Sequence, residues 1–136
     1  LKRIKSFSNT SLDFGFETTL SGKTYIKYLT NIKKLGYQIN LFFLWIPNSK
    51  LAIERIKERV IGGGHNVPTK DVIRRYQRSI YNFFNLYRNL VDSWMLFDNS
   101  DVQPNLIASQ HNNLPLNIKN KELFNNLLNK YGEKND

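Results

Sequence analysis

The sequence predicts an α/β domain built on a mainly parallel sheet with helices on both faces. Segments with strand-like and helix-like patterns alternate along the chain. The run "LFFLWI" at residues 41–46 is continuously apolar, which is typical of a strand buried on both faces of a parallel sheet. The chain has 136 residues, of which 40% are hydrophobic, so residues 1–136 are expected to form a single domain around one core.

The first half of the chain contains two predicted strands separated by a helix. Residues 12–17, "LDFGFE", are expected to form a short strand. A helix is expected over about 23–35, because apolar side chains recur there at helical spacing and Ser21 can cap the first turn. Gly36 then supplies the left-handed residue that ends this helix. Residues 37–46 form the second predicted strand, which is expected at the centre of the sheet.

The second half continues the alternation of helices and strands. A cap at Asn48 or Ser49 precedes the next helix, and the glycines at 62–64 break it. The remaining predicted elements are a helix at about 50–61, a long helix at about 68–91, a strand at 93–98 near the central strand, a fourth strand at 105–109 at a sheet edge, and a helix at 121–131. Residues 109–120 are expected to form a polar loop.

Composition and charge narrow the classes of function. The net charge of +9 favours an anionic partner, although a basic surface without such a partner also fits it. The chain has no cysteine, and His65 and His111 have no partner at metal-ligand spacing, so we assign no metal ligand. The chain start lacks the apolar core of a signal peptide, and the longest apolar run is too short to span a bilayer. We therefore predict a cytoplasmic protein that does not bind membranes.

The segment "GFETTLSGKTY" at residues 15–25 ends like a phosphate-binding loop. Such a loop has the spacing G-x-x-x-x-G-K-S/T, whereas six residues separate Gly15 from Gly22 here. Glu17 stands where the first glycine belongs, and its carboxylate would repel phosphate oxygens. The spacing therefore argues against a phosphate loop at this position.

Arginines follow the two helices on either side of the glycine turn. On the long helix, Asp71, Arg75, Arg78 and Asn82 recur at helical spacing, and Arg59 lies near the end of the preceding helix. The planar, permanently charged guanidinium group suits phosphate, so a hinged helical pair could close over a triphosphate. The alternative is a helical pair with a solvated basic face.

Several separated motifs, taken together, resemble the zeta-toxin family of P-loop kinases. They are "FETTLSGKTYIKYL", "GYQINLFFLWIPNSKLAIERIKERV", "GGHNVP", "IRRYQRSIYNFFNLY" and "DSWMLFDNS", in this order over roughly residues 14–100. The resemblance implies a P-loop kinase-like sheet and an enzyme that uses ATP and Mg²⁺ to phosphorylate a small molecule. For the toxins of this family, the acceptor is the 3′-hydroxyl of UDP-N-acetylglucosamine.

The resemblance also implies roles for individual residues. Glu17 and Thr18 of "FETT" would bind the acceptor sugar or orient its hydroxyl. Arg59 and Arg75 would neutralise charge on the transferring phosphoryl group, in a lid formed by residues 54–82. Arg74 and Arg78 are second choices for contacts to the nucleotide, and His65 is expected to shape the lid turn rather than to transfer protons.

This sequence departs from the family pattern at its beginning. The family starts with a strand, a phosphate loop with its lysine and an aspartate that acts as catalytic base, and none of these is present here. We therefore predict the C-terminal part of such a kinase, with a sheet incomplete at the N-terminus and no activity of its own. Expected partners are ATP, a nucleotide sugar and an antitoxin protein, whereas a nucleic acid is not expected. The alternative is a non-catalytic remnant that binds a polyanion or a partner protein through its basic lid.

Overall fold

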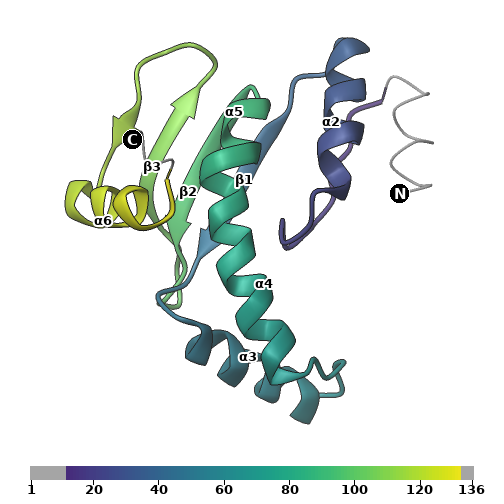
Figure 1. Ribbon diagram of the computed structural model, residues 1–136, viewed down its shortest axis with the longest axis vertical. Helices are drawn as coiled ribbons and strands as arrows, with labels where there is room; N and C mark the ends of the chain where they lie inside the picture. The colour runs from purple at the N-terminus through teal and green to yellow at the C-terminus, as the bar shows by residue number, and fades with distance from the viewer. Residues whose placement is uncertain (1–11, 133–136) are drawn as a thin grey trace.

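A four-stranded mixed sheet organises residues 12–132, the part of the chain described by the computed structural model (Figure 1). The elements are α2 (Thr24–Lys34), β1 (Asn40–Trp45), α3 (Ser49–Ile61), α4 (Thr69–Asn82), the π-helical segment η1 (Phe83–Tyr87), α5 (Arg88–Leu90), β2 (Ser93–Asp98), β3 (Asn105–His111), β4 (Asn117–Ile118) and α6 (Lys121–Tyr131). The predicted helices and the strands at 37–46 and 93–98 are thus present, with small shifts at their ends.

The strands lie in the order β1-β2-β3-β4, and only one pair of them is parallel. β1 and β2 run parallel, from the pair Asn40–Ser93 to the pair Trp45–Asp98. β3 pairs antiparallel with both β2 and β4, so the predicted mainly parallel sheet is wrong, although the α/β class is compatible with this architecture. Only residues 99–104 connect β2 to β3, and a parallel connection needs about a dozen residues or more. The short connection therefore imposes the antiparallel direction.

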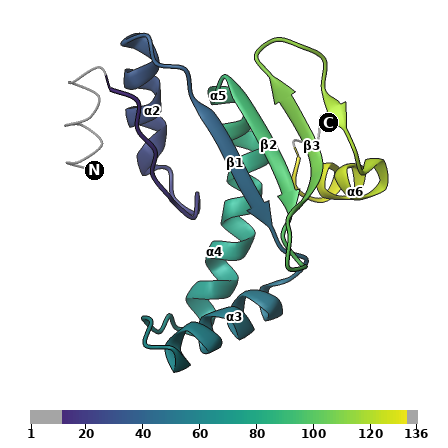
Figure 2. The ribbon, with the colours of Figure 1, turned by 180° about the vertical axis from the view of Figure 1, so that it is seen from behind.

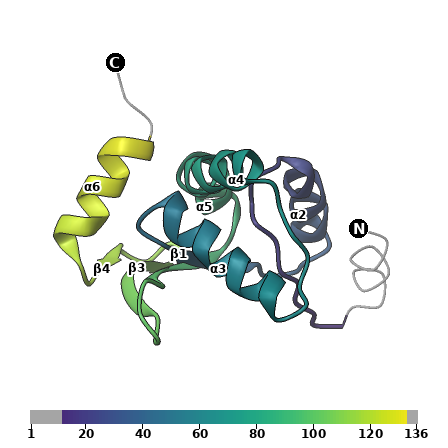
Figure 3. The same ribbon diagram turned by 90° about the horizontal axis from the view of Figure 1, so that it is seen from below.

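Within residues 12–132, the helices cover only one face of this sheet, so the prediction of helices on both faces is also wrong. α4, η1 and α5 lie across that face with α2 and α6 on either side, and α3 lies beyond the end of the sheet (Figures 1 and 3). The strand predicted to be central, β1, is an edge strand among the described residues. Its Phe43 and Trp45 side chains are buried, whereas Phe42 and Leu44 are 63% and 54% exposed. The continuous apolar run therefore combines one buried face with one exposed apolar face.

Two further strand predictions need correction. Residues 12–17 form no strand, and they pass along α2 on the side of the molecule beyond β1 (Figure 2). The strand predicted at 105–109 extends to His111 and lies between β2 and β4 instead of at an edge. The polar stretch expected to be a loop supplies the edge strand β4, whose pairing covers only Ala108–Ile118 and Ser109–Asn117. A two-residue ladder leaves too little periodicity to be recognised in sequence.

Aromatic side chains from η1 form the centre of the core. Phe83 is fully buried, and its ring centroid lies 4.9 Å from that of Phe43 and 5.4 Å from that of Trp94. Phe84 and Tyr87 of the same segment are also buried. The predicted helix at 68–91 is therefore one continuous helical rod, which α4, η1 and α5 form together. Its π-helical segment η1 packs against the sheet. Among the described helices, none is long and apolar enough to cross a membrane.

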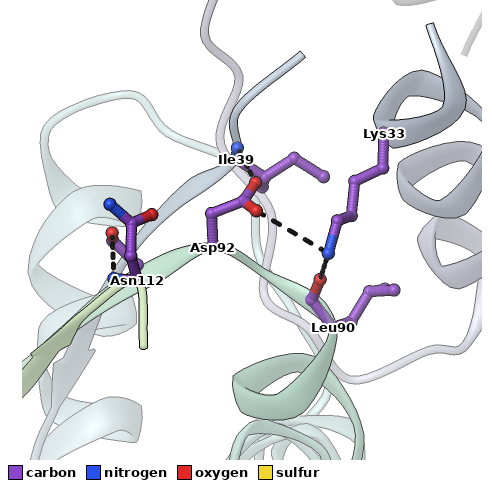
Figure 4. A network of polar contacts seen from close by, with 6 residues as sticks. Lys33, Ile39, Leu90, Asp92 and Asn112 are labelled. Carbon is purple, nitrogen blue, oxygen red and sulfur yellow. Dashed lines mark hydrogen bonds and ion pairs between the residues drawn. The ribbon is translucent and has the colours of Figure 1, made fainter. Parts of the chain in front are cut away.

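A polar network fixes the start of β1 to the neighbouring helices (Figure 4). Asp92 accepts a hydrogen bond from the backbone N–H of Ile39 at 2.7 Å, and its other carboxylate oxygen lies 3.7 Å from the Lys33 ammonium. Lys33 also donates to the carbonyl of Leu90 at 3.0 Å. One carboxylate and one ammonium thus join α2, α5 and Ile39, the residue before β1, which sets where β1 enters the sheet.

Candidate functional site

A cleft of about 810 Å³ lies between β1, residues 16–20 and the α3–α4 pair. We call it the arginine cleft, and its polar lining includes Glu17, Thr18, Arg55, Arg59, His65 and Arg75. The structure thus places both proposed acceptor-binding residues and both proposed phosphoryl-binding arginines on one cleft.

The turn between α3 and α4 is built for a tight reversal of the chain. Asn48, one of the two caps that the sequence allows, caps α3 by accepting a hydrogen bond from the N–H of Leu51 at 2.9 Å. After α3, Gly63 has a φ of 95°, a conformation that favours glycine. A Cβ at Gly64 would lie 2.9 Å from the Arg59 carbonyl oxygen, so a side chain there would force a shift of backbone. These glycines allow the chain to reverse tightly, so that arginines of α3 and α4 line the same cleft.

The orientation of α4 separates Arg75 from the two second-choice arginines. Arg75 lines the cleft, and since each helical residue advances by about 100°, Arg74 and Arg78 lie to the side of it. Arg74 is 3.3 Å from the carboxylate of Asp71 on the same helix. Arg78 lines a separate hollow of about 520 Å³ together with Lys130. The structure therefore does not bring Arg74 and Arg78 to the arginine cleft.

Arg55 belongs to the cleft and was not assigned from the sequence. Its Nη2 donates to the carbonyl of Asn99 at 2.7 Å and, more weakly, to that of Ser100 at 3.4 Å. These contacts tie α3 to the turn after β2 and hold a half-buried guanidinium at the cleft. The available signal was its position one helical turn before Arg59, which places both side chains on one face of α3.

Residues 16–20 form one wall of the cleft, and side chains of the long helical rod hold this wall in place. Leu20 has a φ of 57°, which is uncommon for a residue with a side chain. Buried Asn82 donates to the Leu20 carbonyl at 2.7 Å, and the Tyr87 hydroxyl donates to the Gly22 carbonyl at 2.7 Å. The Thr18 hydroxyl accepts from the Leu20 N–H at 3.3 Å. The positions of Glu17 and Thr18 thus depend on two side chains of the rod.

Replacing Asn82 with alanine is expected to destabilise the fold by about 1–3 kcal/mol, because the substitution removes the hydrogen-bond donor of the Leu20 carbonyl. Urea unfolding followed by circular dichroism measures this loss. Asn89→Ala is the matched control, since Asn89 is exposed on α5. Equal losses in the two variants would contradict a holding role for Asn82.

Tyr76 contributes a group with a shifted pKa at the edge of the cleft. Its hydroxyl donates to the carbonyl of Ile46 at 2.9 Å. Burial raises the pKa of Tyr76 from 10.0 to about 12; the neighbouring Tyr131 acts in the same direction, and the Trp45 side chain opposes both. The neutral phenol is therefore favoured in the folded protein and keeps α4 attached to the end of β1.

This shift predicts a loss of stability at alkaline pH. The pKa of Tyr76 is higher in the folded chain, so its contribution is complete below pH 10 and is lost as the pH rises towards 12. The unfolding temperature of Tyr76→Phe, which cannot ionise at this position, should fall less steeply over that interval. Thermal unfolding at several pH values tests this. The pKa of Tyr87 is also raised by burial, and this residue remains in both proteins as an internal reference. Parallel pH profiles would contradict the assignment.

The charges in the cleft suit an anion better than a metal ion. Arg55, Arg59 and Arg75 form no ion pair with any described residue. Guanidinium groups bind phosphate and carboxylate through paired N–H donors. Within residues 12–132, no three His, Asp or Glu side chains are grouped so that they could hold a metal ion. The residues present therefore fit phosphate groups, and they do not by themselves fit the Mg²⁺ of a kinase site.

Comparisons with known proteins give one match. An uncharacterized protein of Haemophilus influenzae (strain KW20 / Rd) is 34% identical over 65 residues, which cover 48% of this chain and 46% of that protein. The chain thus matches about half of the length of this relative. No protein-family model matches the chain, and no solved structure does. None of these comparisons supports the zeta-toxin resemblance, which stays a prediction from the sequence motifs.

Proposed function

We propose that the arginine cleft binds a nucleotide sugar such as UDP-N-acetylglucosamine, as the acceptor-binding part of a zeta-toxin-type kinase. One observation carries this proposal: guanidinium groups from α3 and α4 share a cleft with the carboxylate of Glu17 and the hydroxyl of Thr18. Cations on one wall suit the two phosphates of the ligand, and hydrogen-bonding groups on the other suit sugar hydroxyls.

Each side chain has a defined task in this proposal. Arg59 and Arg75 pair with phosphate oxygens, and Arg55, fixed by the turn after β2, extends the same positive wall. Glu17 accepts a hydrogen bond from an acceptor hydroxyl, and Thr18 either donates to the sugar or accepts from it. ATP with Mg²⁺ would supply the transferable phosphoryl group. The described residues do not fit that metal, so we derive no transfer step from them.

Titration of the chain with UDP-N-acetylglucosamine, UDP and uridine tests this proposal. Isothermal titration calorimetry gives the affinities, and NMR shift changes identify the residues that respond. We expect UDP and the nucleotide sugar to bind more tightly than uridine, with shifts at Thr18, Arg59 and Arg75. The nucleotide sugar should bind more tightly than UDP, since only it reaches Glu17. Uridine binding as tightly as UDP would contradict the proposal.

The chain alone is expected to transfer no phosphoryl group from ATP. The sequence has no correctly spaced phosphate loop and therefore no loop lysine to hold the β- and γ-phosphates. Incubation with ATP, Mg²⁺ and UDP-N-acetylglucosamine, followed by mass spectrometry of the sugar, should give no product above a buffer control. Product formation that persists after repeated purification, and that Arg75→Ala abolishes, would overturn this expectation.

A second candidate is a non-catalytic protein that binds polyanions through the helical pair. Its support is the net charge of +9 and the exposure of Arg59, Arg74 and Arg78 on α3 and α4. Heparin binding distinguishes the two candidates. Polyanion binding should weaken to a similar extent for Arg74→Ala and Arg75→Ala, whereas nucleotide-sugar binding should weaken for Arg75→Ala alone.

A further inference from the structure

A second hollow, of about 520 Å³, lies on the α6 side of the long helical rod. It is lined by one flank of α4, residues 47–49 and the end of α6, whereas residues 16–20 of the arginine cleft lie on the α2 side of the rod (Figure 1). Tyr76 lines both spaces and thus lies between them. The volume is in the range of sites that hold small ligands. We call this space the tyrosine hollow.

Hydrogen bonds hold the three parts of the tyrosine hollow together. The Tyr76 hydroxyl donates to the Ile46 carbonyl at 2.9 Å, which fixes residues 47–49 beside α4. Asn85 of the rod donates to the Tyr131 carbonyl at 2.6 Å, which fixes the end of α6. The hollow is therefore formed by contacts within the chain before any ligand enters, as is usual for a binding site.

The tyrosine hollow carries two cations with no carboxylate beside them. Arg78 is exposed on α4 and Lys130 is exposed near the end of α6, and neither forms an ion pair with a described residue. No aspartate or glutamate is among the described residues that line the hollow. A guanidinium group binds paired oxygens, and an ammonium group acts as a point charge. Together they suit a ligand with two negative charges.

Aromatic rings lie in the same hollow as these cations. Tyr81 is 53% exposed, and half-buried Tyr131 lies across the hollow on α6. The Lys130 ammonium lies 5.3 Å from the centroid of the Tyr131 ring, so charge and ring meet at one place. An exposed tyrosine ring stacks well with an aromatic ligand. A phosphate monoester carries close to two negative charges at neutral pH.

We propose that the tyrosine hollow binds a phosphate monoester attached to an aromatic ring, such as a nucleoside monophosphate or a phosphotyrosine side chain. Arg78 and Lys130 bind the phosphate oxygens, and the ring of the ligand stacks on Tyr81. UDP-N-acetylglucosamine has no terminal phosphate monoester, so the ligand differs from the one proposed for the arginine cleft. This proposal does not depend on the proposed function.

An NMR titration with phenyl phosphate tests the proposal. The amides of Tyr81 and Tyr131 report binding at this hollow, even where phosphate also enters the arginine cleft. We expect phenyl phosphate to bind at least about tenfold more tightly than inorganic phosphate or phenol, since each of these makes only one kind of contact. Unshifted amides at both tyrosines, or equal affinities for phenyl phosphate and inorganic phosphate, would overturn the proposal.

Substitutions separate the charge contact from the ring contact. Lys130→Ala should weaken binding of both phosphate and phenyl phosphate about tenfold, as expected for the loss of one charge-assisted contact. Lys121→Ala removes the same charge from the exposed start of α6 and should have less than about a twofold effect. Tyr81→Ala should weaken the binding of phenyl phosphate alone, and Tyr81→Phe should retain it. Equal effects of the two lysine variants, or equal losses for the two tyrosine variants, would overturn the proposal.

AMP and N-acetyl-O-phosphotyrosine amide distinguish the two sources of such a ligand. Both contain the phosphate monoester and an aromatic ring, but the ring lies at a different distance from the phosphate. Tighter binding of AMP would support a nucleotide ligand, and tighter binding of the phosphotyrosine compound would support a modified protein segment. If neither compound shifted the amides of Tyr81 and Tyr131, the proposal would be wrong.

Discussion

Replacing Phe83 with alanine should lower the free energy of unfolding by about 3–5 kcal/mol. Phe83 is fully buried and contacts rings from both β1 and β2, so its removal leaves a cavity between the helical rod and the sheet. A domain of this size is typically stable by only about 5–15 kcal/mol, so the variant should be close to unfolding at 37 °C. Urea unfolding monitored by tryptophan fluorescence measures the effect.

Tyr81→Ala is the matched control for this substitution. Tyr81 is an aromatic residue on the same rod, two positions before Phe83, and its side chain is 53% exposed. Its replacement should cost less than about 1 kcal/mol, as surface substitutions generally do. A loss for Phe83→Ala no larger than that of this control would show that η1 does not form the centre of the core.

The double variant Arg59→Ala/Arg75→Ala should bind UDP-N-acetylglucosamine about a hundredfold more weakly than the unchanged chain. This prediction rests on the proposed function. A charge-assisted hydrogen bond to phosphate contributes about 1.5 kcal/mol, which corresponds to about tenfold in the dissociation constant for each arginine. Both residues line the cleft, and neither is paired with a described carboxylate. Isothermal titration calorimetry measures the change in affinity.

Arg74→Ala/Arg78→Ala supplies a control with the same loss of charge. Both residues belong to α4 and lie outside the cleft, so this variant lowers the overall positive field without removing a phosphate contact. We expect less than about a threefold effect at physiological salt, where distant charges are screened. Equal weakening by the two double variants would mean that affinity follows net charge, which would favour the polyanion-binding alternative.

The sequence predicted most helices because their signals are local. Asn48 caps α3 and Gly36 has a φ of 94°, and both follow from rules that involve a few neighbouring residues. The sheet was less predictable because pairing depends on residues far apart in the chain. The apolar run of β1 suggested burial on both faces, yet Phe42 and Leu44 are exposed. The direction of β3, by contrast, could have been inferred from the short connection at 99–104.

The candidate site shows the same division between local and distant information. Spacing along α4 located Arg75, but it could not show that Arg78 points to a different hollow. Arg55 was missed because its role depends on the carbonyl of Asn99, which is far away in the sequence. That Glu17 lies on the same cleft as Arg75 is a property of the tertiary fold, and the sequence suggested it only through resemblance to a family.

The π-helical segment η1 lies between α4, which carries Arg75, and α5, within the rod that these three segments form. A π turn contains an extra residue relative to an α-helix, and each residue corresponds to about 100° of rotation. The extra residue is therefore taken up within the π turn, and the α-helical parts on either side keep the orientation they would have in an uninterrupted helix. Loss of one codon within 83–87 would restore an α-helical turn and leave Arg75 on the cleft, whereas loss of one codon from α4 after Arg75 would rotate Arg75 by about 100° away from it. In the α-helical part of the rod, the number of residues thus matters as much for the site as their identity.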